Sequence, residues 1–507
     1  MIMLVIMVVG TVAILVSTLN SSALQIARDK TTADALAKAK DALVGYAASN
    51  ATRPGELPCP DLNNDGVQDA CASPNLVGWL PWKTLGLPEL RDANGDHLWY
   101  AVSDAFRPGS TAALTSDTPS AYPASVLSLK DGVSGTQIEN NVVAIVFSPG
   151  TPLGQTRSLN DNNASASLPN YLEGDNANLD MTFQTANDKV IPLPTPAVND
   201  RPLTIGKDSL LLVVETRIAR DAKKCLDDYA ALSAGKYPWA APVSDATYTS
   251  TSGTYFGRIP AAPSTSGGPL TPTISALLAA QSQLSSVQTA LNAYAANPNA
   301  TNTSNLLNAA LTLISMKSNP LFTSTVSNAV DNAGDGARNL ANGAGSTVSS
   351  VNNVIASANS VINTALNNAG YTSGDPAMAS SWAAVPSCNA LFTAPYWVNW
   401  QSEVFYQVAN GFQPNSTASC GSCLSITGSG NPAAGSGTYR AAVAVARQPL
   451  AGQWPRNFSS DASYLEGINR HATAPSTAFV AYSPSDTANY ANVNDLVLCL
   501  DGRMNCQ

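Results

Sequence analysis

The chain opens with the stretch MIMLVIMVVGTVAILVSTLNSSALQIARDKTTADALAKAKDALVGYAAS, residues 1–49. Residues 1–16 carry no charge, and the first basic residue is Arg28. From Ser22 to Ser49 there is no proline, and apolar residues recur at three- and four-residue spacing. That spacing is typical of an amphipathic helix. The stretch therefore predicts one continuous helix over about residues 1–50, which would be ~70 Å long at 1.5 Å per residue.

Three explanations fit the apolar start of this helix: a signal peptide, a membrane anchor or a buried core helix. A signal peptide normally starts with positive charge and ends at a small-residue cleavage site, and neither is clear here. A simple anchor needs ~20 apolar residues, and Met1–Leu19 just reaches that length. The amphipathic continuation favours a helix whose first half suits lipid and whose second half packs on a globular head.

The composition is that of an extracellular, loop-rich protein. The 507 residues are 44% hydrophobic and only 12% charged, with 34 glycines and 33 prolines. A chain of this length and apolar content can form more than one packed core. The net charge of -9 argues against a nucleic-acid partner.

The eight cysteines favour disulfides in an oxidising compartment over zinc or redox chemistry. Only two histidines, His97 and His471, are present, and Cys420–Cys423 is the one CxxC, without a second pair beside it. Sequence alone does not give the connectivity. The pairing we expect is Cys59–Cys71, Cys225–Cys388, Cys420–Cys423 and Cys499–Cys506.

The segments after the helix are GELPCPD (55–61) and GWLPWKTLGLPELRDANGDHLWYAV (78–102). Together with the apolar start and the long helix, they resemble the type IV pilin and type II secretion pseudopilin superfamily. The resemblance implies that prepilin peptidase removes a leader, that the new N-terminus at Met1 is methylated, and that the chain lies in the inner membrane before its helix enters a filament. It also implies assembly roles for Met1, position 5 and Gly10, where neighbouring helices approach closely or the helix bends.

One departure from the family is at position 5, where pilins usually carry a glutamate that neutralises a neighbour's N-terminal amine. Here the residue is Val5. Either this subunit assembles without that pair, or residue 1 is not the true mature N-terminus. Minor pilins and pseudopilins at filament tips sometimes lack the glutamate, so a tip role is an alternative.

The rest of the chain repeats itself in order, which indicates an internal duplication. LWYAVSDAFRP (98–108) matches VFYQVANGFQP (404–414), and YLEGDN (171–176) matches YLEGIN (464–469). Further matches join residues 143–146 to 443–446, 198–200 to 493–495, 78–81 to 257–260, 26–29 to 218–221 and 42–47 to 225–230. Short β-branched and aromatic runs such as Asn141–Phe147 and Tyr439–Val445 predict strands.

We therefore expect an α+β fold in which a long N-terminal helix, residues 1–50, precedes two tandem pilin-like heads with antiparallel β-sheets. The first head spans about 26–207 and shares the second half of the helix, and the second spans 208–507. Residues 261–381 interrupt the second head. This segment is rich in Ala, Ser and Asn, is nearly uncharged, and has apolar residues at helical spacing. This insertion predicts two or three helices. It is either a contact surface or a tolerated insertion in a surface loop.

The loop Asp61-Leu62-Asn63-Asn64-Asp65-Gly66-Val67-Gln68-Asp69 predicts a calcium site. Oxygen ligands on alternate residues, with a glycine at the sharp turn, are what a calcium loop needs. The expected ligands are Asp61, Asn63, Asp65, Val67 and Asp69, bracketed by Cys59 and Cys71. The alternative is an Asx-rich turn without metal, and the shorter Asp92–Asp96 and Asn160–Asn163 favour that explanation.

No catalytic residues are expected. Glu173 and Glu466 lie one in each repeat, so they are more simply equivalent structural residues than partners in glycoside hydrolysis. The leading hypothesis is a structural subunit of an extracellular, type IV pilus-like filament, made as a homopolymer by the pilus or type II secretion machinery. A minor tip pilin or pseudopilin, acting in adhesion or secretion, is the alternative. A membrane-anchored surface hydrolase ranks below both.

Overall fold

The structure is a computed structural model. It describes residues 2–72, 76–193, 197–233, 235–251, 253–263, 272–368, 381–414, 423–427, 439–471, 476–482 and 493–500, with side chains in the first helix described from Ser22 onward. The fold is α+β with a long N-terminal helix and antiparallel sheets, as the sequence predicts.

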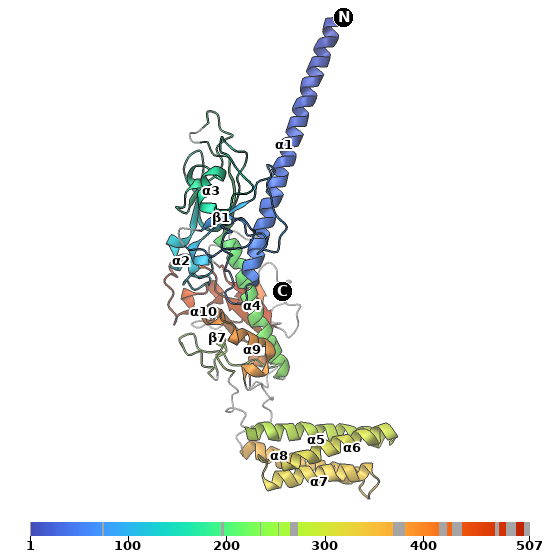
Figure 1. The fold of residues 1–507 in the computed structure, drawn as a ribbon. Coiled ribbons are helices and arrows are strands. Elements are labelled where there is room, and N and C mark those ends of the chain that lie inside the picture. The colour runs from blue at the N-terminus through green and yellow to red at the C-terminus, as the bar shows by residue number, and fades with distance from the viewer. Residues whose placement is uncertain are drawn as a thin grey trace.

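Helix α1 spans Ile2–Ser49 without interruption. Its N-terminal part projects away from the rest of the molecule, and its C-terminal part lies along the first sheet (Figure 1). The packed face repeats every three or four residues and consists of Thr32, Ala35, Leu36, Ala39, Leu43 and Ala47, all buried. The periodicity seen in the sequence is thus the face that α1 turns to the sheet.

The first sheet contains six strands. Its central antiparallel order is β6-β4-β2-β1, and β3 pairs with the first part of β4 and lies parallel to β5. The strands are β1 (Val77–Trp79), β2 (Trp99–Val102), β3 (Leu127–Lys130), β4 (Gln137–Ser148), β5 (Thr182–Gln184) and β6 (Arg201–Gly206). One apolar cluster joins α1 to this sheet, and a second covers its other face. We call α1 with this sheet the first head.

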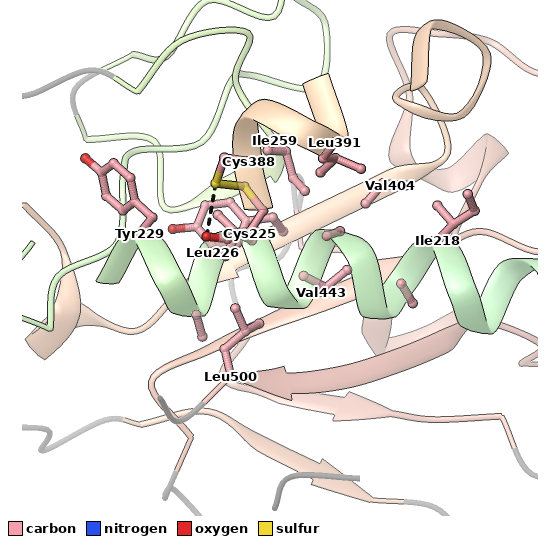
Figure 2. Close-up of a cluster of buried hydrophobic side chains, with 14 of the residues drawn as sticks. Ile218, Cys225, Leu226, Tyr229, Ile259, Cys388, Leu391, Val404, Val443 and Leu500 are labelled. Carbon is pink, nitrogen blue, oxygen red and sulfur yellow. Dashed lines mark hydrogen bonds between the residues drawn. A yellow bond between two sulfur atoms is a disulfide. The ribbon is translucent and has the colours of Figure 1, made fainter. Parts of the chain in front are cut away.

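The second head begins with helix α4 (Lys207–Leu232). Four antiparallel strands follow in the order β12-β10-β8-β7, and β9 and β11 form a separate parallel pair. The strands are β7 (Phe256–Arg258), β8 (Val404–Val408), β9 (Ser425–Thr427), β10 (Ala441–Val445), β11 (Ala478–Val480) and β12 (Leu496–Leu500). Figure 2 shows α4 packed on this sheet, with Ile218 toward Val404 and Leu226 toward Leu500, and with Cys225 bonded to Cys388 of α9 (Pro386–Thr393).

The two heads therefore share one plan: a helix, then four antiparallel strands in the same order. Equivalent hydrogen bonds show which residues of the two heads correspond to one another. The Tyr100 hydroxyl donates to the Pro58 carbonyl at 3.1 Å, and the Tyr406 hydroxyl donates to the Pro238 carbonyl at 2.7 Å. After each helix a glycine amide closes the turn, since Gly55 donates to Ala47 and Gly235 donates to Ala230.

Two of the sequence matches are out of register. Because Ala47 and Ala230 are equivalent, Ile218 corresponds to Ala35 rather than to Ile26. Ile218 and Ala35 are both buried, whereas Ile26 is 68% exposed. Likewise, residue 443 corresponds to residue 146 rather than 143, since each pairs with the tyrosine of the neighbouring strand. Repetitive apolar sequences allow such shifts, and only the packing decides between them.

The described part of the insertion contains four α-helices rather than the two or three expected: α5 (Pro272–Ala296), α6 (Ala300–Ser315), α7 (Ser324–Ala341) and α8 (Val348–Asn368). They pack in a ring in which each contacts the next and α8 contacts α5. The overlooked helix is α7. Its Gly334 lies so close to α6 that an added Cβ would meet the Ile314 side chain at 2.5 Å. Glycine here serves close helix packing rather than a turn.

The insertion leaves and rejoins the second head at neighbouring points. The Trp382 indole N–H donates to the Pro260 carbonyl at 2.9 Å, so the ends of the insertion are held together. The remaining short helices are α2 (Thr118–Ala121), α3 (Ala164–Tyr171), α9 (Pro386–Thr393) and α10 (Trp397–Trp400).

Candidate assembly helix and paired carboxyl sites

The part of α1 that leaves the first head presents apolar side chains to solvent. Residues 22–28 are all exposed, with Leu24 67% and Ile26 68% accessible. The apolar sequence of residues 2–16 continues the same helix in the N-terminal direction. Exposed large apolar groups on a projecting helix need a partner to cover them, because burying them releases about 25 cal/mol per Å².

The point at which α1 meets the head is marked by polar contacts. Asp29 forms an ion pair with Arg201 of β6 at 2.7 Å, and the hydrogen bond from Arg201 lowers the pKa of this exposed carboxyl. Three residues on, the Thr32 hydroxyl accepts the Ala93 amide at 3.1 Å. From Thr32 to Ser49 the helix packs against the first head.

The C-terminal half of α1 is fixed at both sides. The Lys40 ammonium donates to the Thr204 carbonyl of β6 at 2.9 Å. At the helix end, the Arg217 guanidinium from α4 donates to the carbonyls of Ala48 at 2.7 Å and Asn50 at 2.6 Å. A cation at a helix C-terminus satisfies orphan carbonyls and complements the helix dipole. The second head thereby holds the helix of the first.

The predicted assembly residues are only partly described. Met1 lies outside the described residues. Val5 and Gly10 lie within α1, but their side chains lie outside the described set. Among the described residues, no helix meets the length and hydropathy needed to cross a membrane.

The predicted calcium loop is closed by its own hydrogen bonds. The Asp61 carboxylate is 1% exposed and accepts the amides of Asn63 at 3.0 Å, Asn64 at 2.6 Å and Gly66 at 2.6 Å. Burial is the main reason its pKa is raised. The other side-chain oxygens do the same: Asn63 accepts the Asp65 amide at 3.0 Å, Asp65 accepts that of Val67 at 2.7 Å, and Asp69 accepts that of Leu62 at 2.7 Å.

Such successive Asx turns account for the spacing of the acidic residues without a metal. The Cys59–Cys71 disulfide brackets the loop as expected. In the described part of the chain, no group of three or more His, Cys, Asp or Glu side chains is arranged to hold a metal ion. Calcium binding by Asp61–Asp69 stays a prediction.

The other two acidic segments are also turns. Asp92 Oδ1 accepts the amides of Asn94 at 2.8 Å and Asp96 at 3.1 Å, while its Oδ2 accepts the Ser148 hydroxyl at 2.8 Å. Asn163 caps α3 by accepting the Ala166 amide at 3.1 Å. The Asp92 and Asn163 side-chain oxygens thus have backbone or hydroxyl partners, while Asp96 pairs with Arg157 at 2.7 Å.

The glutamates of the two YLEG segments lie in separate heads and form matched carboxyl sites. In the first head, Asp200 Oδ2 accepts the Glu173 amide at 2.8 Å and the Asn176 side-chain amide at 3.0 Å. In the second head, Asp495 Oδ2 accepts the Glu466 amide at 3.1 Å and the Asn469 side-chain amide at 2.9 Å.

The match extends to the glutamate side chains. Glu173 accepts from the Gln155 side chain at 3.2 Å and the Asn199 amide at 3.3 Å. Glu466 accepts from the Gln453 side chain at 2.8 Å and the Asn494 amide at 3.0 Å. We call these two sets the paired carboxyl sites. They tie the loop after the YLEG segment to the start of the last strand of each head.

Burial raises the pKa of all four carboxyls in the paired carboxyl sites. The neighbouring glutamate raises the pKa of Asp200 and of Asp495 further, well above the ordinary range. One oxygen of each aspartate, Oδ1, accepts no hydrogen bond from any described group. Both facts are explained if Oδ1 carries a proton, because a protonated oxygen is a donor to its glutamate rather than an acceptor. These are structural clamps, and each lies inside its own head.

A buried charge cluster at the junction of the heads was missed from sequence. Glu215 of α4 is fully buried, pairs with Arg447 at 2.5 Å and accepts the Ser116 hydroxyl at 2.9 Å. The Ser116 amide donates to Glu403 at 3.1 Å. Asp117 pairs with Arg456 at 2.6 Å.

Burial, and then the charge of Asp117, raises the pKa of Glu403 to about 8. The partners are 99 to 339 residues apart in the chain, so no local motif could have indicated this cluster.

The cysteines and histidines take structural positions. Cys225–Cys388 is the second predicted disulfide present. Cys423 and Cys499 are also disulfide-bonded, and their expected partners Cys420 and Cys506 lie outside the described residues. His97 bonds to Asn64 at 2.7 Å, and buried His471 bonds to the Ile468 carbonyl at 2.6 Å.

No protein-family model, curated protein or solved structure matches this chain.

Proposed function

We propose that this chain is a structural subunit of an extracellular, type IV pilus-like filament, and that it polymerises through the projecting part of α1. The observation that carries the proposal is the division of one continuous helix into a half that packs on the first head and a half that does not. Residues 22–28 are exposed although they include Leu24 and Ile26, and residues 2–16 are uncharged.

A helical polymer covers such a surface with copies of itself. Burial of a leucine or isoleucine side chain from water contributes roughly 1.5–3 kcal/mol. Transfer from a membrane contributes less, because lipid is already apolar and the association then depends on helix packing. The heads, fixed to the helix by Arg201 and Arg217, would lie on the outside of the polymer.

The proposed route to the filament follows the resemblance: cleavage by prepilin peptidase, N-methylation, residence in the inner membrane and extraction by a pilus or type II secretion machine. A second candidate, a minor tip pilin or pseudopilin, is favoured by Val5 at the place of the usual glutamate. The two candidates differ in stoichiometry, since a major subunit is abundant and a tip subunit is rare.

The exposed apolar residues of α1 provide the test. The double substitution Leu24→Glu and Ile26→Glu should abolish filaments in sheared cell-surface fractions, because it places charges in the packed core of the polymer. The heads should keep their melting temperature, since both side chains are exposed. Val398→Glu is the matched control, because Val398 is 67% exposed on the second head. Normal filaments from the double variant would refute assembly through this surface.

A further inference from the structure

The second head has a pocket of about 690 Å³ at one end of its sheet. Trp239 and Tyr255 provide aromatic surface, and Gln407, Asn410, Gln413 and Thr477 provide amide and hydroxyl groups. The volume is within the range of roughly 300–1,000 Å³ typical of small-ligand sites.

The correspondence between the two heads identifies the residues of the first head that are equivalent to those lining this pocket. Pro58 and Pro238 are equivalent, so Trp239 takes the position of Cys59. Tyr255 takes the position of Leu76, because Val102 donates to Leu76 at 3.0 Å and Val408 donates to Tyr255 at 2.9 Å.

In the first head a disulfide and an ion pair occupy this end of the sheet. Cys59 is bonded to Cys71 there. Arg107, at the position of Gln413, donates to the Cys71 carbonyl at 3.2 Å and pairs with Asp104 at 2.6 Å. Asp104 stands at the position of Asn410, so an ion pair and a disulfide in one head are replaced by two amides and a tryptophan in the other.

The lining favours a neutral, hydrogen-bonding ligand. None of the described residues that line the pocket is Asp, Glu, Lys or Arg, so the lining itself offers no counter-charge to an anion or a cation. Trp239 is 7% exposed, so it offers the pocket only a small part of its ring, and its indole nitrogen is buried away from solvent.

The amide of Gln407 is held in place behind the pocket. Its nitrogen donates to the Ser476 carbonyl at 2.8 Å, and its oxygen contacts the His471 ring. Gln407 is 2% exposed and thus forms the back wall of the pocket, whereas the amides of Asn410 and Gln413 are the more accessible ones.

We propose that this pocket binds a saccharide: a neutral ligand whose hydroxyls pair with the amide and hydroxyl side chains and whose C–H faces pack on the aromatic rings. The proposal is independent of filament assembly. It gives the second head a recognition role that the first head lacks.

The test is binding of the full-length chain, in detergent, to an array of neutral, sialylated and sulfated oligosaccharides with glucose, galactose, mannose and N-acetylglucosamine termini. We expect neutral oligosaccharides to bind, and the pair Asn410→Ala and Gln413→Ala to weaken Kd by at least about tenfold. Asp104→Ala, the equivalent of Asn410→Ala in the first head, should leave Kd unchanged.

Asn410 is exposed and Gln413 partly so, and melting curves of each variant separate lost binding from lost folding. No neutral oligosaccharide bound more tightly than ~1 mM, binding of acidic oligosaccharides alone, or binding that the Asn410 and Gln413 substitutions leave intact would each overturn the proposal.

Discussion

The two heads are built on one plan and differ in what surrounds it. Both place a helix on four antiparallel strands in the same order, and both fasten the last strand with a Glu–Asp pair. The first head carries the projecting helix and has a disulfide and an ion pair at one end of its sheet. The second head carries the helical insertion, a disulfide from its helix to α9, and a pocket at the corresponding end of its sheet.

The difference shows which features belong to the shared framework and which are specific to one head. Packing positions of the helix and the paired carboxyl sites recur in both heads, so they stabilise the framework. Features present once, such as exposed Leu24 and Ile26 or the Trp239 pocket, are where specific functions are expected.

Removal of the disulfides should give the largest difference in stability between the two heads. Cys225–Cys388 joins residues 163 apart, whereas Cys59–Cys71 joins residues 12 apart. In the loop-entropy description, the double alanine variants should lose about 5 and about 3 kcal/mol of unfolding free energy respectively. Denaturant unfolding under non-reducing conditions measures both. Equal losses would mean that loop length is not what distinguishes the two bonds.

Substitutions in the paired carboxyl sites should cause equal losses of unfolding free energy in the two heads, smaller than those from removing the disulfides. Asp200→Ala and Asp495→Ala each leave a buried backbone amide and a buried side-chain amide without an acceptor, at about 2–3 kcal/mol. Asp41→Ala on the exposed side of α1 should change stability by less than about 0.5 kcal/mol. Thermal melts of the three variants make the comparison, and a large loss in only one head would show that the two sites are not equivalent.

The junction cluster should make stability depend on pH. Glu403 has a folded pKa of about 8, above the ~4.3 of an unfolded glutamate, so the folded state holds a proton that the unfolded state releases. The contribution of Glu403 to stability is therefore fully present below pH ~4.3 and falls by up to about 1.4 kcal/mol per pH unit as pH rises towards the folded pKa.

Glu403→Gln removes this titration and keeps an acceptor for Ser116. The variant should show a flatter fall of melting temperature between mildly acidic and mildly basic pH than the natural chain. The carboxyls of the paired sites also have raised pKa values, so part of the slope should remain. An unchanged slope would mean that Glu403 is not protonated in the folded state.

Local patterns predicted much of this architecture. The uninterrupted periodicity of residues 22–49 indicated α1 and its packed face. The ordered matches indicated strands in both heads and included the segments that contain both Glu–Asp pairs, but not the pairing itself. The expected disulfides at Cys59–Cys71 and Cys225–Cys388 are present.

The features that could not be predicted from the sequence depend on packing between residues that are far apart in the chain. The register of the two helices was wrong because apolar residues recur at several compatible spacings. Helix α7 was overlooked although Val326, Val330, Ala333, Ala337 and Leu340 follow helical spacing, and its interior glycines Gly334 and Gly336 have low helix propensity. The Glu215–Arg447 pair and the Trp239 pocket join residues that are far apart in the chain, and no motif marks them.

The central claim is that this chain is a filament subunit assembled through α1. Electron microscopy of filaments sheared from the cell surface, with mass spectrometry of the dominant band and its N-terminal peptide, tests it most directly. The account predicts that this chain is the dominant protein and that its N-terminal peptide is methylated at Met1, with Val5 in place of the usual glutamate. A chain that is present only in trace amounts, or that stays in the membrane fraction, would contradict the major-subunit role.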